Sequence, residues 1–87
     1  MRKIQFSQDA FKQFVEWQKI DEDLFDKINE LIRDVSRDPF GGIGKPEALK
    51  GNFKGFWSRR INKKHRLVYQ VESDNIYIHS CYGHYDD

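Results

Sequence analysis

The chain has 87 residues, of which 38% are hydrophobic and 15% aromatic, and its formal net charge is +1. This length predicts one domain over residues 1–87, and the aromatic content excludes an intrinsically disordered chain. A single cysteine, Cys81, excludes an intramolecular disulfide, and no apolar run approaches the roughly 20 residues of a transmembrane helix. A signal peptide requires an apolar stretch after its basic N-terminus, and this chain has none there. We therefore expect a soluble, cytoplasmic protein with no membrane partner.

The first forty residues predict one short strand followed by two helices. Polar and apolar residues alternate over residues 2–6, which is the period of a strand. Ser7 offers a side-chain cap, and apolar residues at helical spacing extend the first helix to residue 19. A second apolar stripe runs from Leu24 to Val35, and Pro39 with the glycines after it ends that helix. The very short connection predicts an antiparallel helical hairpin.

In the second half of the chain the hydrophobic pattern changes to that of strands. Residues 56–61 and 65–71 have this pattern, and a third such segment contains Ile76 and Ile78. Turn-forming residues separate the segments, so we expect an antiparallel meander, with a further short strand around residues 48–50. The order β-α-α-β-β-β predicts an α+β fold, in which a small antiparallel sheet carries the helical hairpin on one face. The opposite face is left to Lys, Arg and Tyr side chains.

Positive charge is concentrated in residues 41–69, which carry eight Lys or Arg residues and one Glu, a net charge of +7. A cationic segment in a nearly neutral domain is typical of an anion-binding surface, and nucleic acid is the obvious polyanion. Trp57, in the same segment, is expected in the core rather than stacked on a base. The residues predicted to contact RNA phosphates are Lys45, Lys50, Arg59, Arg60 and His65.

Three residues match the chemical requirements for cleaving an RNA phosphodiester without a metal ion. A base must take the proton of the 2′-hydroxyl, cations must stabilise the charge of the phosphorane, and an acid must protonate the leaving 5′-oxygen. Glu47 is the candidate base, Arg66 the cation and His84 the acid. Tyr85 is a candidate for stacking on a base or for a hydrogen bond to the phosphate.

Two features of the sequence count against these roles. Neighbouring lysines stabilise the carboxylate form of Glu47, which weakens it as a base. Strict strand alternation from Ile78 aims His84 at the face that the helices cover, which conflicts with catalysis. A bulge or bend redirects the imidazole, and Gly83 permits one because glycine adopts backbone conformations that other residues avoid.

The C-terminal segment also offers a metal-binding and a thiol alternative. His79, Cys81 and His84 are close enough in sequence to be metal ligands, but no fourth ligand or CxxC pair accompanies them. Cys81 with His84 is an equally weak nucleophile pair, because nothing marks the thiol as activated. The sequence has no Walker loop and no GxGxxG motif, so we expect neither a metal ion nor a nucleotide cofactor.

Several motifs together resemble the YoeB (Txe/YoeB) toxins of bacterial type II toxin–antitoxin systems, which belong to the RelE/ParE superfamily. The resemblance covers nearly the whole chain and is highly specific as a combination. The matching segments are residues 27–32, 44–47, 49–50, 55–61, 65–69 and the pair His84-Tyr85.

The resemblance implies a ribosome-dependent mRNA endonuclease, or mRNA interferase, that cuts mRNA in the ribosomal A site and inhibits translation. Carried over motif by motif, it implies that Glu47 is the general base, Arg66 stabilises the phosphate and His84 is the general acid. Tyr85 then helps to place the RNA. The resemblance also implies the small sheet with two helices on one side that the residue pattern predicts independently.

The same resemblance implies partners. They are a YefM/Phd-type antitoxin, operator DNA reached indirectly through the antitoxin complex, and a second copy in a homodimer. The chain departs from the family pattern at Asp86-Asp87, which add negative charge beside the terminal His-Tyr pair, and at Tyr82-Gly83, where some relatives have a basic residue. Two alternatives act by protein binding without cleaving RNA: a ParE-like toxin, and a repressor subunit that stays bound to the antitoxin.

Overall fold

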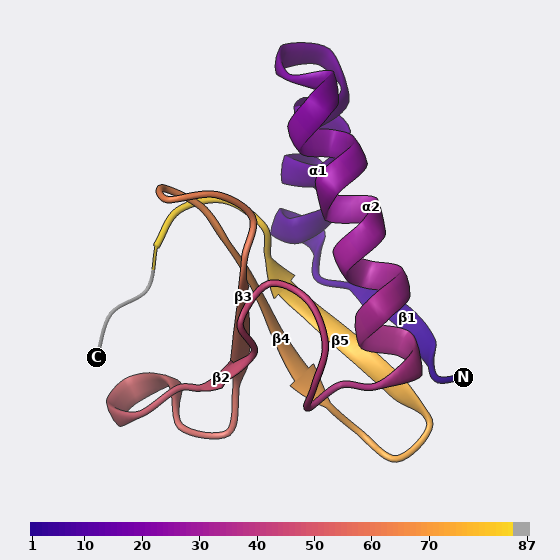
Figure 1. The fold of residues 1–87 in the computed structure, drawn as a ribbon, viewed down its shortest axis with the longest axis vertical. Helices are drawn as coiled ribbons and strands as arrows, with labels where there is room; N and C mark the ends of the chain where they lie inside the picture. Colours follow the sequence, from indigo (N-terminus) through magenta and orange to yellow (C-terminus); the bar gives the residue numbers. More distant parts are fainter. Residues whose placement is uncertain (85–87) are drawn as a thin grey trace.

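The structure, a computed structural model, describes residues 1–84 (Figure 1). Its elements run in the order β1 (Lys3–Phe6), α1 (Gln8–Ile20), α2 (Glu22–Arg37), β2 (Glu47–Ala48), the 3₁₀ turn η1 (Gly51–Phe53), β3 (Trp57–Arg60), β4 (Arg66–Val71) and β5 (Asn75–Ser80). Both helices and all the expected strands are present, and their ends fall close to the predicted positions.

The two helices begin at side-chain caps. Ser7 Oγ accepts a hydrogen bond of 3.0 Å from the N–H of Ala10 at the start of α1. Asp21 Oδ1 accepts one of 3.1 Å from the N–H of Leu24 at the start of α2. Asp21 also ends α1, where its own N–H donates to the carbonyl of Trp17. One residue therefore connects the helices, which confirms the predicted tight hairpin.

The sheet has the strand order β1-β5-β4-β3-β2, and the strands from β2 to β5 form the predicted antiparallel meander. The prediction of a wholly antiparallel sheet is wrong at β1, which pairs parallel to β5 with Ile4 opposite Ile76. Periodicity identifies a strand but not its neighbour or its direction. Because β1 joins the meander only through the helical hairpin, no tight turn forces it to be antiparallel.

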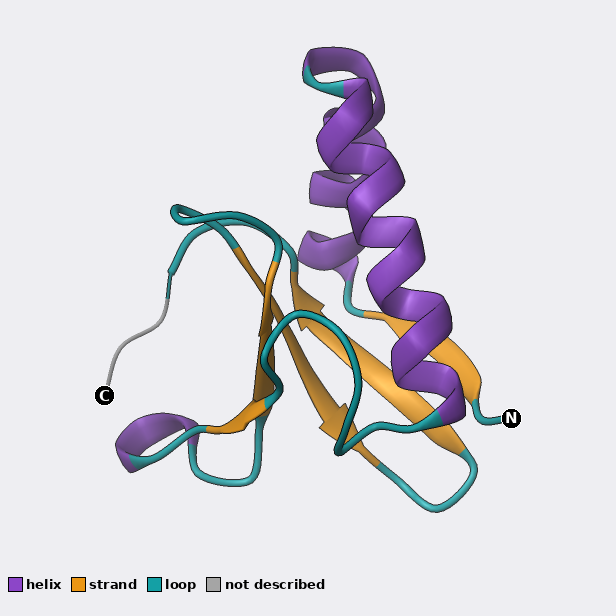
Figure 2. Cartoon of the chain, in the orientation of Figure 1, coloured by secondary structure: helices purple, strands orange, loops and turns teal. Residues whose placement is uncertain are grey.

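The main core lies between the helical hairpin and one face of the sheet (Figure 2). Its fully buried aliphatic and aromatic side chains include Ile28, Leu31 and Val35 of α2 and Leu67, Tyr69, Ile76 and Ile78 of the sheet. Trp57 packs against this core, as expected. Within residues 1–84, neither helix has the length and apolar character needed to cross a membrane.

The sequence predicted that Lys, Arg and Tyr side chains would cover the opposite face of the sheet. The structure shows that apolar side chains cover part of it. The segment around η1, which follows the edge strand β2 (Figure 1), brings a small apolar cluster to that face. Leu49 is buried, and the Phe56 ring lies 5.2 Å from the His79 ring of β5, with Phe53 next to both. This second cluster holds the segment that follows β2, and so it steadies the edge strand that carries Glu47.

Candidate active site

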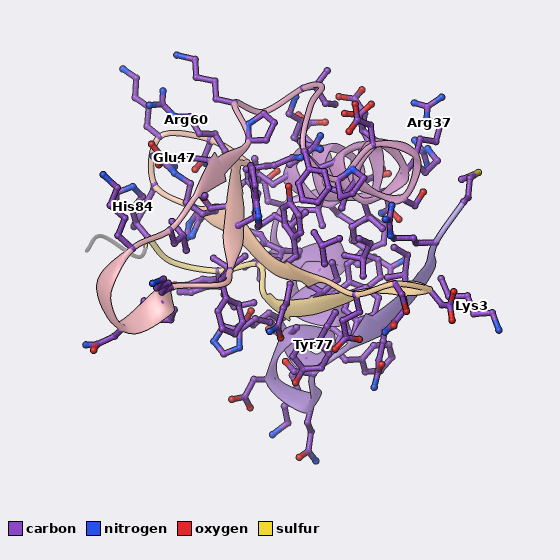
Figure 3. All side chains as sticks on the ribbon, turned by 90° about the horizontal axis from the view of Figure 1, so that it is seen from below. Lys3, Arg37, Glu47, Arg60, Tyr77 and His84 are labelled. Atoms are coloured by element: carbon purple, nitrogen blue, oxygen red, sulfur yellow. The ribbon has the colours of Figure 1, made fainter. Side chains whose placement is uncertain are left out.

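A surface pocket of about 460 Å³ collects most of the predicted site residues. We call it the β2–β4 pocket, after the strands that build it. Figure 3 shows Glu47, Arg60 and His84 on one side of the molecule, with Lys3 on the opposite side. The residues that line the pocket are Lys45, Pro46, Glu47, Ser58, Arg60, Arg66 and His84.

The register of the sheet explains why these side chains meet. Glu47 of β2 lies opposite Ser58 of β3, and Arg60 of β3 lies opposite Arg66 of β4. Residues directly opposite each other point to the same face, with Cβ atoms about 5 Å apart. Two arginines in that position repel each other unless an anion lies between them. The pair therefore favours a phosphate or carboxylate in the pocket.

Arg66 is oriented by the turn that precedes β4. Its Nη1 donates hydrogen bonds of 2.6 Å to the carbonyl of Asn62 and 3.1 Å to the carbonyl of His65. These contacts fix one edge of the guanidinium while the residue still lines the pocket. A planar cation held in this way is suited to a phosphate oxygen, because its geometry is set before the anion arrives.

The loop that leads into β2 is held tightly against β3. Gly44 has a φ of +83°, and its carbonyl accepts a hydrogen bond of 2.6 Å from the N–H of Arg60. A Cβ atom at Gly44 would lie 2.7 Å from Cδ2 of Leu31. Lys45 follows with a φ of +53°, in the left-handed region. This turn brings Lys45 and Glu47 to the pocket.

Arg59 is not a phosphate contact, and that prediction is wrong. The residue is fully buried, because alternation on β3 sends its side chain inward while Ser58 and Arg60 line the pocket. Its guanidinium donates five hydrogen bonds of 2.6–3.1 Å, to a carboxylate oxygen of Asp34, the carbonyls of Asp38, Gly41 and Ile43, and the hydroxyl of Tyr69. Arg59 therefore ties down the loop before β2.

The buried network also lowers the pKa of Asp34 below its ordinary value of 3.8. The largest cause is the hydrogen bond from the N–H of Ile43 to Asp34 Oδ2, and the hydrogen bond and charge of Arg59 act in the same direction against desolvation. The Tyr69 hydroxyl completes the network by donating to the carbonyl of Pro39 at 2.7 Å. Asp34 is thus an ionised structural partner of Arg59.

His65 is not a phosphate contact either. It is buried, and its Nδ1 accepts a hydrogen bond of 2.9 Å from the N–H of Gly83. Its ring packs edge-on against Trp17, at a centroid distance of 4.8 Å, and is tilted against Tyr82 at 4.6 Å. Burial, with a smaller effect of the Lys64 charge, lowers the pKa of His65 below 6.5. A neutral imidazole of this kind contributes no charge for binding RNA.

The last strand ends before His84, which removes the conflict with strand alternation. Strand β5 stops at Ser80, and Gly83 has a φ of +89°, so the chain bends as Gly83 was expected to allow. The bend turns His84 into the β2–β4 pocket. The imidazole, Glu47 and the two arginines thus line one site.

The thiol alternative is contradicted by the surroundings of Cys81. Its side chain is fully buried, and burial raises the pKa of the thiol to about 12. A thiol with that pKa supplies almost no thiolate at neutral pH, so it is not a nucleophile. Within the described part of the chain, no three His, Cys, Asp or Glu side chains form a group that could hold a metal ion.

One predicted site residue lies elsewhere, and another is not described. Lys50 directly precedes η1 and does not line the β2–β4 pocket, so its role as a phosphate contact stays a prediction. Tyr85 falls outside the described residues. Ser58, which was not among the predicted site residues, lines the pocket opposite Glu47. The alternation of β3 was the available signal, because Ser58 and Arg60 are two residues apart.

Comparison with known proteins gives a consistent family match. The family model for YoeB-like toxins of bacterial type II toxin–antitoxin systems matches residues 6–85. The chain is 49% identical over 83 residues to "Toxin YoeB" of Escherichia coli K12, covering 95% of this chain and 99% of that one. Relatives named YoeB also come from Synechocystis and Streptomyces coelicolor.

Solved structures of YoeB toxins also match this chain. The YoeB dimer of Staphylococcus aureus is 47% identical and superposes with a TM-score of 0.89, covering 97% of this chain and 98% of that chain. The toxin chain of a heterotetrameric YoeB–YefM complex from the same organism gives 46% identity and a TM-score of 0.88, over 98% and 99% of the two chains.

Proposed function

The chain belongs to the YoeB-like toxins of bacterial type II toxin–antitoxin systems, and from this premise we propose that it is an endoribonuclease that cleaves mRNA on the ribosome. The observation that carries the proposal is the β2–β4 pocket. It brings a carboxylate, an imidazole and two facing arginines, Arg60 and Arg66, to one open site. This set supplies the acid, base and cations of metal-independent phosphodiester cleavage.

In the proposed reaction Glu47 takes the proton from the 2′-hydroxyl of the nucleotide on the 5′ side of the cut. The 2′-oxygen then attacks the adjacent phosphorus, and Arg60 and Arg66 stabilise the negative charge that develops on the phosphorane oxygens. His84, protonated, gives its proton to the leaving 5′-oxygen. The products are a 2′,3′-cyclic phosphate and a free 5′-hydroxyl.

Dependence on the ribosome is consistent with the openness of this site. Glu47, Arg60 and His84 are exposed, so nothing among the described residues encloses an RNA strand and forces it into line for attack. Orientation of reacting groups contributes several kcal/mol to catalysis, on the order of 7–11 in the best cases. A ribosome that holds A-site mRNA in a fixed path supplies this orientation, so we expect naked RNA to be cut much more slowly.

We further propose a YefM/Phd-type antitoxin as the partner that inhibits the site. The support is the toxin of the Staphylococcus aureus YoeB–YefM complex, which this chain resembles over nearly its whole length. Arginine donates paired hydrogen bonds to carboxylates as well as to phosphates, so an acidic segment of an antitoxin is suited to cover the facing arginines. A homodimer, such as the one reported for the Staphylococcus aureus relative, and indirect binding to operator DNA through the antitoxin belong to the same proposal.

The decisive experiment compares one mRNA, free and bound to programmed ribosomes, at the same RNA and salt concentrations. We expect fast cleavage only on the ribosome, with cuts in phase with the codons. A 2′-deoxynucleotide on the 5′ side of the cut should abolish cleavage there, because the attacking oxygen is missing. Lys3→Gln, which removes a cation on the far side of the molecule, is the control for general loss of charge.

Two outcomes would contradict the proposal. Equal rates on free and ribosome-bound RNA, with no reading-frame phase, would indicate a general ribonuclease. Growth arrest on induction without any new mRNA 5′ ends would indicate inhibition by protein binding, as in a ParE-like toxin.

A further inference from the structure

The segment that follows β5 is held by four hydrogen bonds over three residues. Trp17 Nε1 donates to the carbonyl of Cys81 at 2.8 Å, and the N–H of Cys81 donates to Gln13 Oε1 at 2.8 Å. At Gly83, the N–H donates to His65 Nδ1 at 2.9 Å, and the carbonyl accepts from the N–H of Arg66 at 2.8 Å. The last two bonds act on the residue next to His84.

We propose that His65 is a positioning residue for the reaction. By accepting a hydrogen bond from the N–H of Gly83, its side chain fixes the bend that aims His84 into the β2–β4 pocket. The inference rests on the proposed function, since it assigns a role in placing the acid of that site. His65 does not line the pocket, so it acts through Gly83 rather than by touching RNA.

The surroundings of His65 make its Nδ1 atom a hydrogen-bond acceptor. An imidazole nitrogen accepts a hydrogen bond only when it carries no proton, so the Gly83 contact requires the neutral ring with its proton on Nε2. The ring planes of Trp17 and Tyr82 restrict its rotation from two sides. The backbone of His65 is held as well, because its N–H donates to Asn62 Oδ1 at 2.7 Å.

Loss of this acceptor has a specific consequence for the next residue. The N–H of Gly83 is partly buried, and a buried donor without a partner is costly, so the backbone shifts to find water. Gly83 has a φ of +89°, where glycine has many alternative conformations, and nothing lies within 4 Å of the position of an added Cβ. The bend therefore has room to change. A misplacement of about 1 Å at a catalytic group costs on the order of a hundredfold in rate.

The test uses two variants that separate the ring from the acceptor. His65→Phe keeps an aromatic ring between Trp17 and Tyr82 but removes the acceptor. His65→Asn removes the ring but places an amide oxygen near the position of Nδ1. Cleavage of ribosome-bound mRNA gives kcat and KM, and NMR gives the Gly83 amide and His84 imidazole resonances. Val35→Ala, a core change on α2 far from the bend, is the control for loss of stability alone.

We expect His65→Phe to lower kcat at least tenfold with little change in KM, and to shift the Gly83 and His84 resonances. His65→Asn should keep most of the turnover and the wild-type resonances, although its melting temperature falls. Val35→Ala should lower the melting temperature without affecting kcat. If His65→Phe does not fold, His65→Gln serves as the acceptor-free variant. The amide oxygen of glutamine extends beyond the position of Nδ1 and so does not replace that acceptor.

Unchanged Gly83 and His84 resonances in the acceptor-free variant would overturn the proposal, whatever its activity. Equal losses of kcat in the Asn and Phe variants would also overturn it, because the ring and not the acceptor would then matter. If the wild-type protein fails to cleave mRNA, the proposed function is wrong, while the NMR comparison still decides whether His65 positions His84.

Discussion

Two adjacent arginines of β3 have opposite surroundings, and we predict opposite phenotypes for them. Arg59→Gln removes a fully buried guanidinium, with its ion pair to the partly exposed Asp34 and several hydrogen bonds, which should cost about 3–5 kcal/mol of stability. Arg60→Gln, at an exposed pocket residue, should leave the urea midpoint unchanged and slow cleavage instead. Urea unfolding and ribosome-bound cleavage measured on both proteins check the assignment. An Arg60→Gln protein that is as unstable as Arg59→Gln would contradict it.

His84→Gln should abolish most of the activity with the fold intact. An amide has no proton to give to the leaving oxygen, and loss of a general acid typically costs a factor of about 10² to 10⁴. His84 is exposed, so its replacement should not disturb the core. The measurement is mRNA cleavage together with the near-UV circular dichroism of the folded protein. Cleavage at the wild-type rate would remove His84 from the mechanism.

The sequence predicted which residue types form the site, but not which of the side chains point into it. Glu47, Arg66 and His84 follow from the chemistry of phosphodiester cleavage, and the pocket brings them together. Arg59 and His65 were wrongly assigned, because formal charge does not say which way a side chain points. Applying the period of two to β3 would have placed Arg59 inside. The same alternation over residues 65–71 puts His65 on the side of the buried Leu67 and Tyr69, but its partner at Gly83, eighteen residues away, could not be read from the pattern.

At the scale of elements, the loop before β2 depends on Gly44. Gly44→Ala combines a φ of +83° with a Cβ atom 2.7 Å from Leu31, so the loop that carries Lys45 and Glu47 must shift. We expect a loss of about 1–3 kcal/mol in stability and a clear loss of cleavage. Gly55→Ala is the matched control, because Gly55 also has a positive φ, of +98°, but nothing lies within 4 Å.

Both glycine variants strain the backbone, but only the Cβ atom of Gly44→Ala meets a neighbouring side chain. Their comparison therefore separates the effect of the contact with Leu31 from that of backbone strain. Urea midpoints and cleavage rates for both proteins provide the measurement. If Gly55→Ala reduces cleavage as much as Gly44→Ala does, the tight packing of the loop against α2 has no special role in placing Glu47.

The elements themselves differed in how well they could be predicted. The helices followed closely from local signals, because Ser7 and Asp21 cap them and each has an apolar stripe. The meander followed from alternation and turn residues. The direction of β1 and the apolar cover from the segment around Phe53 depend on contacts between distant parts of the chain, which periodicity does not encode.

At the scale of the whole molecule, two pKa shifts predict how stability depends on pH. The lowered pKa of His65 means that the unfolded chain takes up this proton near pH 6.5 while the folded protein resists it. Stability is therefore complete above pH 6.5 and declines as the pH falls below it. Asp34, with a pKa lowered from 3.8, adds a second decline in more acidic solution, because its stabilising ionised form is lost there.

Urea midpoints measured across both ranges test this expectation. His65→Asn has no titratable side chain at this position, so its stability should vary less than that of the wild type just below pH 6.5. The decline in acidic solution should persist in that variant, since Asp34 is unchanged. A wild-type protein with the same midpoint on both sides of pH 6.5 would contradict the assignment of a buried, neutral His65.

The place of β5 in the sheet affects the order in which the newly made protein can fold. Strand β5, which follows the other described strands in the sequence, lies between β1 and β4, and Lys3 pairs with Asn75 far along the chain. A growing polypeptide therefore cannot join β1 to the rest of its sheet until β5 has been made, and contacts this distant in sequence form slowly. Chains released before β5 lack both the strand that links β1 to the meander and the pocket residue His84. A bacterium that makes this toxin thus meets the assembled β2–β4 pocket only after the ribosome has made β5 and the residues up to His84.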